Sequence, residues 1–172
     1  MKQFVYIVFL LLSLHVSAQT EKNYGIQFYH GTWKEACDKA KAENKLIFVD
    51  FYTKWCGPCL NMAENVFILP FIGDFYNTNF VNMKIDAENG EGVELAKRYG
   101  VNSYPTYVFV DPKNGDVVHR SKSRQEAEQF LATGKSALVP ELRSGYLIEE
   151  FAKGRDDREF LKNYIHYNAS IY

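Results

Sequence analysis

The spacing of the hydrophobic residues changes along the chain, and each change indicates a different kind of element. From Trp33 onward, apolar side chains recur at i, i+3, i+4 and i+7, which predicts an amphipathic helix. Residues 45–52 then form a nearly continuous apolar run, rich in β-branched and aromatic side chains, which is typical of a strand buried on both faces. A helix followed by such a strand favours an α/β domain.

After this strand, segments with helical periodicity alternate with segments typical of strands. An Asn-Gly pair within residues 112–115 is the turn signal of a β-hairpin. The order of the elements favours a sheet whose first half is parallel and whose last strands are antiparallel. The pattern predicts a helix over residues 60–67 that ends near Pro70, a short helical piece to Tyr76, a helix over 91–99, a helix beginning at Arg124, and strands over 79–86, 106–110 and 116–120.

The last part of the chain has helical periodicity again. Two apolar-periodic segments, residues 142–152 and 158–167, flank a polar stretch that contains glycine, and Asp157 is placed to cap the second helix. This pattern predicts a helical hairpin appended to the α/β domain. Its aromatic side chains need a surface to cover, which is the protein's own core, a partner, or a further helical region beyond this chain. We therefore divide the chain into residues 1–18, 19–139 and 140–172.

The N-terminal segment has the pattern of a secretion signal. Lys2 supplies a positive start, and residues 4–14 form an apolar core that is short for a bilayer span. Residues 16–18, Val-Ser-Ala, match the small-residue pattern that signal peptidase accepts. We expect cleavage after Ala18 and export of the remainder. An uncleaved membrane anchor is the alternative, whereas a lipid-anchored precursor is disfavoured because no cysteine follows the cleavage site.

Composition and charge limit the classes of function. The chain has 172 residues, of which 47% are hydrophobic, and this is ordinary usage for one globular domain with a substantial core. The formal net charge is -1, with both signs mixed along the sequence. Because no basic face is expected to attract a phosphate backbone, nucleic acid is excluded as a partner.

The cysteines carry the candidate chemistry. The chain has three, and Cys56 and Cys59 are separated only by Gly-Pro. Structural disulfides in exported domains usually form frameworks of many cysteines at wide spacings, and a ring this small removes little entropy from the unfolded chain. The spacing therefore predicts a redox pair. Cys37, on the apolar stripe of the first helix, is interpreted as a small buried hydrophobic residue.

A metal half-site is the alternative interpretation of the cysteine pair. A structural zinc site needs a second pair of ligands at suitable spacing. The sequence has no second Cys-X-X-Cys, and its histidines are scattered. We therefore expect neither a metal nor another cofactor.

The residues around the pair indicate a role for each cysteine. If a helix begins near Cys56, its sulfur faces the free N–H groups and positive dipole end of the first turn, which stabilise a thiolate. Cys56 is therefore the candidate nucleophile, and Cys59, one turn along, is the candidate resolving thiol. Gly57 lets a bulky substrate backbone approach, and Pro58 has a backbone angle suited to the start of a helix. Trp55 supplies an aromatic rim.

Asp50 is the one charged residue among residues 46–52, the apolar stretch that precedes the cysteines. A carboxylate buried in such a strand loses hydration, and its pKa rises, so it can hold or accept a proton near neutral pH. The alternative is that Asp50 ends the strand and points into water.

These motifs together resemble the thioredoxin superfamily. The resemblance covers residues 30–135 and is carried by Trp-Cys-Gly-Pro-Cys after a buried strand containing Asp50, and by Tyr-Pro-Thr before the predicted hairpin. The segment that begins at Trp33 is similar to exported bacterial thioredoxin-like proteins. The resemblance implies a thioredoxin-like α/β fold, in which helices flank a central mixed sheet, here with a C-terminal helical extension. It also implies protein thiol–disulfide oxidoreductase activity.

The resemblance implies further roles residue by residue. In the family, the residue that matches Asp50 assists deprotonation of the inner cysteine. Tyr104-Pro105 resembles the family's cis-proline, which leaves residue 104 free to pair with an extended substrate segment; an ordinary trans proline at a strand start is the alternative. Thioredoxins often place a lysine near the aspartate on the neighbouring strand. The matching position here is Asn82, and Lys84 is on the same face and is a candidate substitute.

Two functions follow as hypotheses. The first is an exported enzyme that reduces protein disulfides and is recharged by a membrane electron donor, because Gly-Pro is the central dipeptide of reducing thioredoxins. The second is a thioredoxin-like binding or chaperone module that recognises a partner through the helical extension. The intact cysteine pair, together with Asp50 and Pro105, favours the enzyme.

Overall fold

The computed structural model describes residues 24–171. The predicted leader, residues 1–18, and its cleavage after Ala18 lie outside the described residues. Among residues 24–171, no helix combines the length and the apolar character that crossing a bilayer requires.

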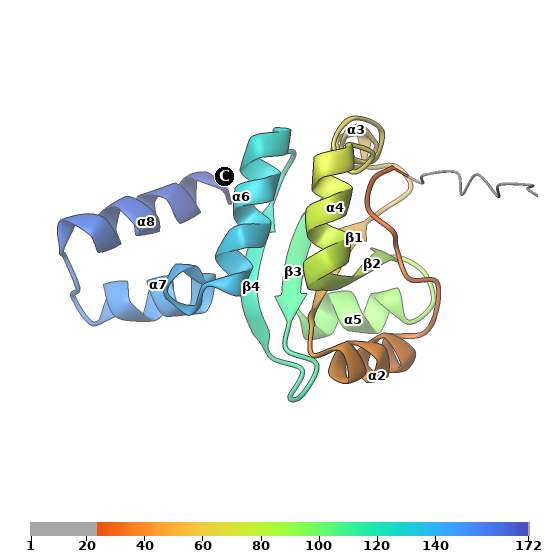
Figure 1. The fold of residues 1–172 in the computed structure, drawn as a ribbon, viewed down its shortest axis with the longest axis horizontal. Helices are drawn as coiled ribbons and strands as arrows, with labels where there is room; N and C mark the ends of the chain where they lie inside the picture. The colour runs from red at the N-terminus through yellow and green to blue at the C-terminus, as the bar shows by residue number, and fades with distance from the viewer. Residues whose placement is uncertain (1–23, 172) are drawn as a thin grey trace, which may run out of the picture.

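A four-stranded mixed sheet forms the centre of the fold (Figure 1). Its spatial order is β2-β1-β3-β4. The β1–β2 pair is parallel, and the β1–β3 and β3–β4 pairs are antiparallel, so the predicted mixed sheet is confirmed. The strands are β1 (Leu46–Tyr52), β2 (Phe80–Asp86), β3 (Thr106–Val110) and β4 (Val117–Lys122).

Helices cover both faces of this sheet. Because strand side chains alternate, Ile47, Val49 and Phe51 enter a core with α2 and α5, whereas Phe48 enters a second core with α3, α4 and α6. The second core is rich in aromatic rings, and Tyr76 stacks on Phe130 with their centroids 4.6 Å apart. The described helices are α2 (Trp33–Glu43), α3 (Gly57–Asn65), α4 (Pro70–Asn79), α5 (Gly92–Arg98), α6 (Ala127–Leu138), α7 (Ser144–Ala152) and α8 (Arg158–Ala169), with a short 3₁₀ turn, η1 (Pro140–Leu142).

The region between the cysteines and β2 differs from the prediction in its boundaries. The structure ends α3 at Asn65, and Pro70 begins α4. A proline fits the first position of a helix because its backbone angle is already helical and its missing N–H has no intrahelical partner there. The predicted separation of two helices near Pro70 is confirmed, but the first helix ends earlier, at Asn65, and α4 continues past Tyr76 to Asn79.

The C-terminal hairpin of α7 and α8 docks on the outer edge of the sheet (Figure 1). The backbone N–H of Ser144 donates to His119 Nδ1 at 3.0 Å, and Ser121 Oγ donates to the carbonyl oxygen of Ser170 at 2.8 Å. Asp157 accepts a hydrogen bond from the N–H of Phe160 at 3.0 Å, so the predicted cap is confirmed. The hairpin covers the edge strand β4, which would otherwise offer unpaired backbone groups to other chains.

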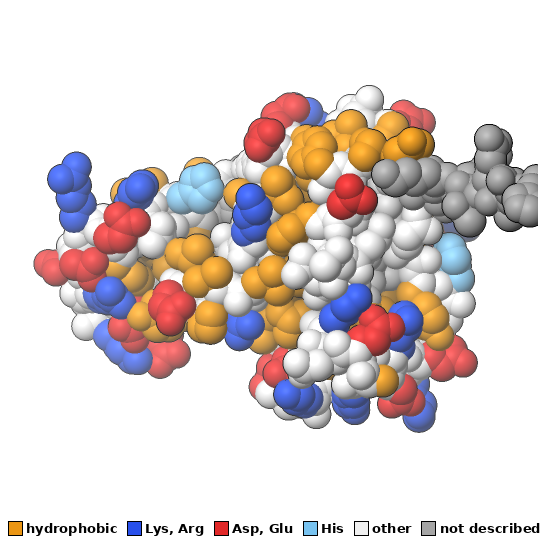
Figure 2. Space-filling view, viewed as in Figure 1, with side chains coloured by type: hydrophobic (Ala, Val, Ile, Leu, Met, Phe, Trp, Pro, Cys, Tyr) orange, Lys and Arg blue, Asp and Glu red, His pale blue; other side chains and the backbone are white. Residues whose placement is uncertain are grey.

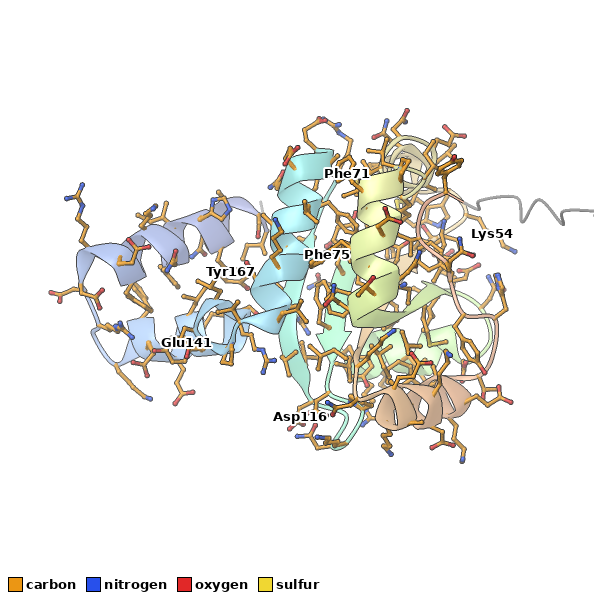
Figure 3. All side chains as sticks on the ribbon, in the orientation of Figure 1. Lys54, Phe71, Phe75, Asp116, Glu141 and Tyr167 are labelled. Atoms are coloured by element: carbon orange, nitrogen blue, oxygen red, sulfur yellow. A yellow bond between two sulfur atoms is a disulfide. The ribbon has the colours of Figure 1, made fainter. Side chains whose placement is uncertain are left out.

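A small third core holds the hairpin together. Leu147, Phe160 and Tyr167 are buried, and Tyr167 lies where α8 meets the rest of the protein (Figure 3). Part of the hairpin's apolar surface therefore covers the protein's own elements. The tip carries acidic and basic side chains together, without one dominant sign (Figure 2).

His119 makes this docking sensitive to acid. It is 2% exposed, and burial, assisted by the nearby Arg143, lowers its pKa from 6.5 to about 4. The unfolded chain therefore binds this proton below pH 6.5 while the folded chain does not, so stability falls as the pH drops from 6.5 through 4. We expect this histidine to account for a loss of about 3 kcal/mol in unfolding free energy between pH 7.5 and pH 4.

The measurement is urea unfolding at both pH values for the wild type, His119→Gln and the exposed control His166→Gln. His119→Gln should reduce the fall in unfolding free energy between pH 7.5 and pH 4, whatever the substitution does to stability at neutral pH. Equal pH dependence in the wild type and His119→Gln would contradict the prediction.

Candidate active site

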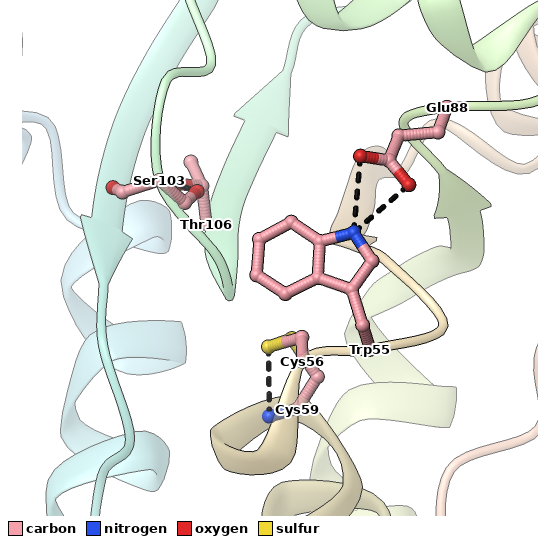
Figure 4. Close-up of a disulfide and its surroundings, with 6 residues drawn as sticks. All are labelled: Trp55, Cys56, Cys59, Glu88, Ser103 and Thr106. Carbon is pink, nitrogen blue, oxygen red and sulfur yellow. Dashed lines mark hydrogen bonds between the residues drawn. A yellow bond between two sulfur atoms is a disulfide. The ribbon is translucent and has the colours of Figure 1, made fainter.

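The redox pair lies at the junction of β1 and α3. Cys56 and Cys59 are joined by a disulfide, and both are nearly buried. Cys56 occupies the cap position before α3, and the N–H of Cys59 donates to its sulfur at 3.1 Å (Figure 4). Pro58 lies in the first turn. The Cys56 sulfur is thus held at the positive end of the helix, where a thiolate is stabilised.

The protein surface beside the disulfide is open on one side and aromatic on another. Gly57 is exposed, and a methyl group added to it would meet no atom within 4 Å. Trp55 is 69% exposed, and its ring meets Tyr104 edge to face with centroids 5.9 Å apart. The indole N–H donates to both carboxylate oxygens of Glu88, at 3.1 and 3.0 Å (Figure 4). These contacts fix the orientation of an otherwise exposed ring.

The loop before β3 reaches the same end of the sheet. The Tyr104–Pro105 peptide bond is cis, which excludes the ordinary trans proline. Pro105 directly precedes Thr106, which pairs with Phe51 near the end of β1. The hydroxyl of Thr106 donates to the carbonyl oxygen of Ser103 at 2.7 Å (Figure 4). The strand pairing therefore brings the proline loop and the cysteine loop to one edge.

Asp50 lies inside the fold and not at its surface. It has no exposed area, and neither carboxylate oxygen has a hydrogen-bond partner among the described residues. Burial raises the pKa of Asp50 to about 7, and the positive charge of Lys84 opposes this rise. The predicted burial is confirmed, and the alternative of a water-facing strand end is excluded.

Strand register decides which side chain on β2 is coupled to this aspartate. Lys84 pairs directly with Asp50, and its ammonium lies 4.8 Å from the centre of the Tyr52 ring. Asn82 pairs instead with Phe48, and its side-chain amide donates to Asn77 Oδ1 at 3.0 Å. Lys84, and not Asn82, is therefore the neighbour of Asp50.

Two further features bear on the chemistry. Within residues 24–171, no group of three or more histidine, cysteine, aspartate or glutamate side chains is arranged to hold a metal ion. The thiol of Cys37 is free and half-buried against the core formed with α2, and burial raises its pKa.

The geometry favours exchange of electrons between the Cys56–Cys59 disulfide and other thiols, with Asp50 able to exchange a proton near neutral pH.

A helix-capped cysteine pair beside a cis-proline on a mixed α/β sheet defines a thioredoxin-like protein. The profile of the thioredoxin-like domain matches residues 33–138, so the chain belongs to this family. The helices α7 and α8 follow the matched region.

Two relatives of known structure and one relative found by sequence agree with this assignment. The structure of a proposed disulphide-isomerase from Bacteroides thetaiotaomicron is 42% identical, covers 68% of this chain and 96% of that chain, and superposes with a TM-score of 0.61. A thioredoxin from Thermus thermophilus is 29% identical over 67% of this chain and 88% of its own, with a TM-score of 0.60. Thioredoxin-1 of Drosophila yakuba is 46% identical over 69 residues, which are 40% of this chain and 60% of that thioredoxin. The alignment thus spans less than two thirds of this curated relative.

Proposed function

We propose that the protein is an exported thiol–disulfide oxidoreductase that reduces disulfides in protein substrates. The observation that carries this proposal is the Cys56–Cys59 disulfide at the start of α3, preceded by a strand with the buried Asp50. Membership of the thioredoxin-like family and the likeness to the proposed disulphide-isomerase support it. The leader pattern of residues 1–18 supports export to the periplasm or beyond.

The proposed reaction transfers two electrons from the dithiol form of the pair to the substrate. The Cys56 thiolate attacks one sulfur of the substrate disulfide, the S–S bond breaks, and the other substrate sulfur leaves as a thiolate. A disulfide now joins Cys56 to the substrate. Cys59 then attacks the Cys56 sulfur, and the second substrate sulfur leaves. The products are a reduced substrate and the Cys56–Cys59 disulfide.

Asp50 serves as the proton acceptor for the second step. Cys59 must lose its proton before it attacks, because the thiolate is the nucleophile. A group with a pKa of about 7 is half ionised at neutral pH, so Asp50 can take this proton and later return it to solvent. Lys84 favours the ionised form that acts as the base.

The exposed rim supplies the substrate-binding surface. Trp55 and Tyr104 offer aromatic area, and Gly57 and Pro58 leave the approach to the Cys56 sulfur open. Pro105 positions residue 104 for backbone pairing with an extended substrate segment, as the family resemblance implies.

Each turnover leaves the enzyme oxidised, so an exported reductase needs a source of electrons. The surrounding compartment is kept oxidising and does not supply them. A membrane donor that passes electrons from the cytoplasm meets this need. The donor is therefore expected to reduce the Cys56–Cys59 disulfide by the same exchange chemistry run in the opposite direction.

The reduction potential of the Cys56–Cys59 pair tests this function. It is measured by equilibration with dithiothreitol buffers, on protein from the exported fraction, whose first residue is expected to be Gln19. A value near the thioredoxin level of about -270 mV agrees with a reductase. A value near about -120 mV would make the protein an oxidant of folding proteins and overturn the proposed direction. A pair that does not form a disulfide at all would leave binding through α7 and α8 as the function.

A further inference from the structure

A groove of about 220 Å³ adjoins the redox pair on the side formed by α3 and the ends of β1 and β2. Trp55 and Gly57 of the substrate-binding rim also line this groove, but Tyr104 and Pro105 do not, so the groove extends that rim on the side away from the cis-proline. Its volume is below the range of about 300–1,000 Å³ typical of sites for drug-sized ligands, and it suits a single side chain. It is lined by residues that include Tyr52, Cys56, Cys59, Leu60, Ala63 and Lys84.

The two sides of the groove differ in polarity. On the helix side, Ala63 is small and Leu60 is 58% exposed, so α3 offers an apolar wall. On the strand side, the ammonium of Lys84 lies over the ring of Tyr52 at 4.8 Å from its centre. This cation–π contact fixes a positive charge at the groove in advance of any ligand.

This positive charge has no ion-pair partner. Among residues 24–171, no carboxylate lies within 4.0 Å of the Lys84 ammonium or of the ammonium of Lys54, an exposed residue that also lines the groove. Lys54 extends from its loop into solvent (Figure 3). Asp50 pairs with Lys84 in register but is wholly buried, and Glu88 binds the Trp55 indole. The groove therefore presents a lysine ammonium without a direct ion-pair partner beside the disulfide.

A second polar group at the groove also has no partner. Thr53 lines it and is only 2% exposed, and its hydroxyl makes no hydrogen bond to any described residue. Buried hydroxyls in proteins nearly always have a partner. A carboxylate that enters the groove can accept a hydrogen bond from the Lys84 ammonium, and Thr53 is a second donor among the lining residues.

We propose that this groove receives an aspartate or glutamate side chain of the protein substrate, next to the disulfide that is reduced, and that Lys84 determines this preference. The inference rests on the proposed function, because it names the class of substrate for the same redox pair. The short aliphatic stem of the acidic residue packs against Leu60 and Ala63, and its carboxylate meets the ammonium.

The test uses three disulfide-bonded peptides that differ only at the residue after one cysteine, which is glutamate, glutamine or lysine. We expect kcat/KM of the reduced protein to be about threefold to tenfold higher for the glutamate peptide than for the glutamine peptide, and lowest for the lysine peptide. The ratio should shrink as salt is added, because part of the groove is open to solvent.

In the Lys84→Gln variant, the ratio of kcat/KM for the glutamate peptide to kcat/KM for the glutamine peptide is expected to be close to one. The matched control is Lys113→Gln, which removes the same charge from the exposed turn between β3 and β4 and should keep the wild-type ratio. Because each ratio compares two peptides on one variant, any general effect of Lys84 on Asp50 or on folding cancels. A wild-type ratio of one, or an unchanged ratio in Lys84→Gln, would overturn the proposal. Failure of the wild type to reduce any peptide would instead overturn the proposed function.

Discussion

Replacing Cys56 with serine is expected to abolish disulfide reduction, whereas replacing Cys59 with serine should leave the first attack intact and trap the substrate. Cys56 is held at the N-terminal end of α3, where a thiolate is stabilised, and serine cannot form a thiolate or a disulfide. Without Cys59, the mixed disulfide lacks the resolving thiol that lies one turn along α3. The measurement is turnover of a protein disulfide with excess dithiothreitol, and mass spectrometry of the products without reductant.

The free thiol provides the matched control for both variants. Cys37 lies in α2 and is half-buried, and Cys37→Ser is expected to keep wild-type turnover and form no adduct. The Cys59→Ser variant should gain the mass of one covalently bound substrate, and Cys56→Ser should gain none. Full turnover by Cys56→Ser, or an adduct on it, would assign the nucleophile to another thiol.

Much of the fold could be predicted from sequence because its signals are local. The apolar run of residues 45–52 predicted β1, which the structure places at Leu46–Tyr52, since a run rich in β-branched and aromatic residues is typical of a strand buried on both faces. The break between α3 and α4 was predicted near Pro70, but the exact end of α3 was not, because a proline can follow a helix or begin one. Pro70 begins α4, and this depends on how Ile72 and Tyr76 pack in the core, which sequence spacing alone does not specify.

The candidate site was likewise predicted where its sequence signals are local and missed where they depend on strand pairing. The cysteine pair and the burial of Asp50 could be inferred from neighbouring residues in the sequence. Glu88 was missed because it reaches Trp55 only after the parallel pairing of β1 and β2 brings the following loop to the cysteines. The choice between Asn82 and Lys84 required the strand register, since both face the same side of β2.

The C-terminal hairpin of α7 and α8 shows that hydrophobic periodicity predicts helices but not where they dock. Its two helices and the cap at Asp157 were predicted, because these signals are local. Its docking on β4 was not, because it depends on residues far apart in the chain: His119 accepts a hydrogen bond from the N–H of Ser144, and Ser121 donates one to the carbonyl oxygen of Ser170. Polar side chains on an edge strand give no sequence signal that distinguishes a solvated edge from a covered one.

Replacing Asp50 with asparagine is expected to stabilise the protein at high pH. An aspartate in the unfolded chain ionises near pH 3.8, whereas the folded protein holds the proton until about pH 7. The stability associated with this proton is therefore present below pH 3.8 and is lost as the pH rises through 7. Asparagine has a similar shape and carries no charge. Asp50→Asn should thus be more stable than the wild type by about 4 kcal/mol at pH 8.5, and by little at pH 4.

The same substitution should slow reduction, since Cys59 loses its proton acceptor. The rate deficit should be largest near pH 7, and it should shrink at alkaline pH, where hydroxide removes the thiol proton without help. Urea unfolding and turnover are measured across this pH range, with Asp74→Asn on the exposed side of α4 as the control. A variant that is no more stable at pH 8.5 would show that Asp50 bears no buried charge there. A variant that gains the stability but reduces substrates at the wild-type rate would remove Asp50 from the proton transfer.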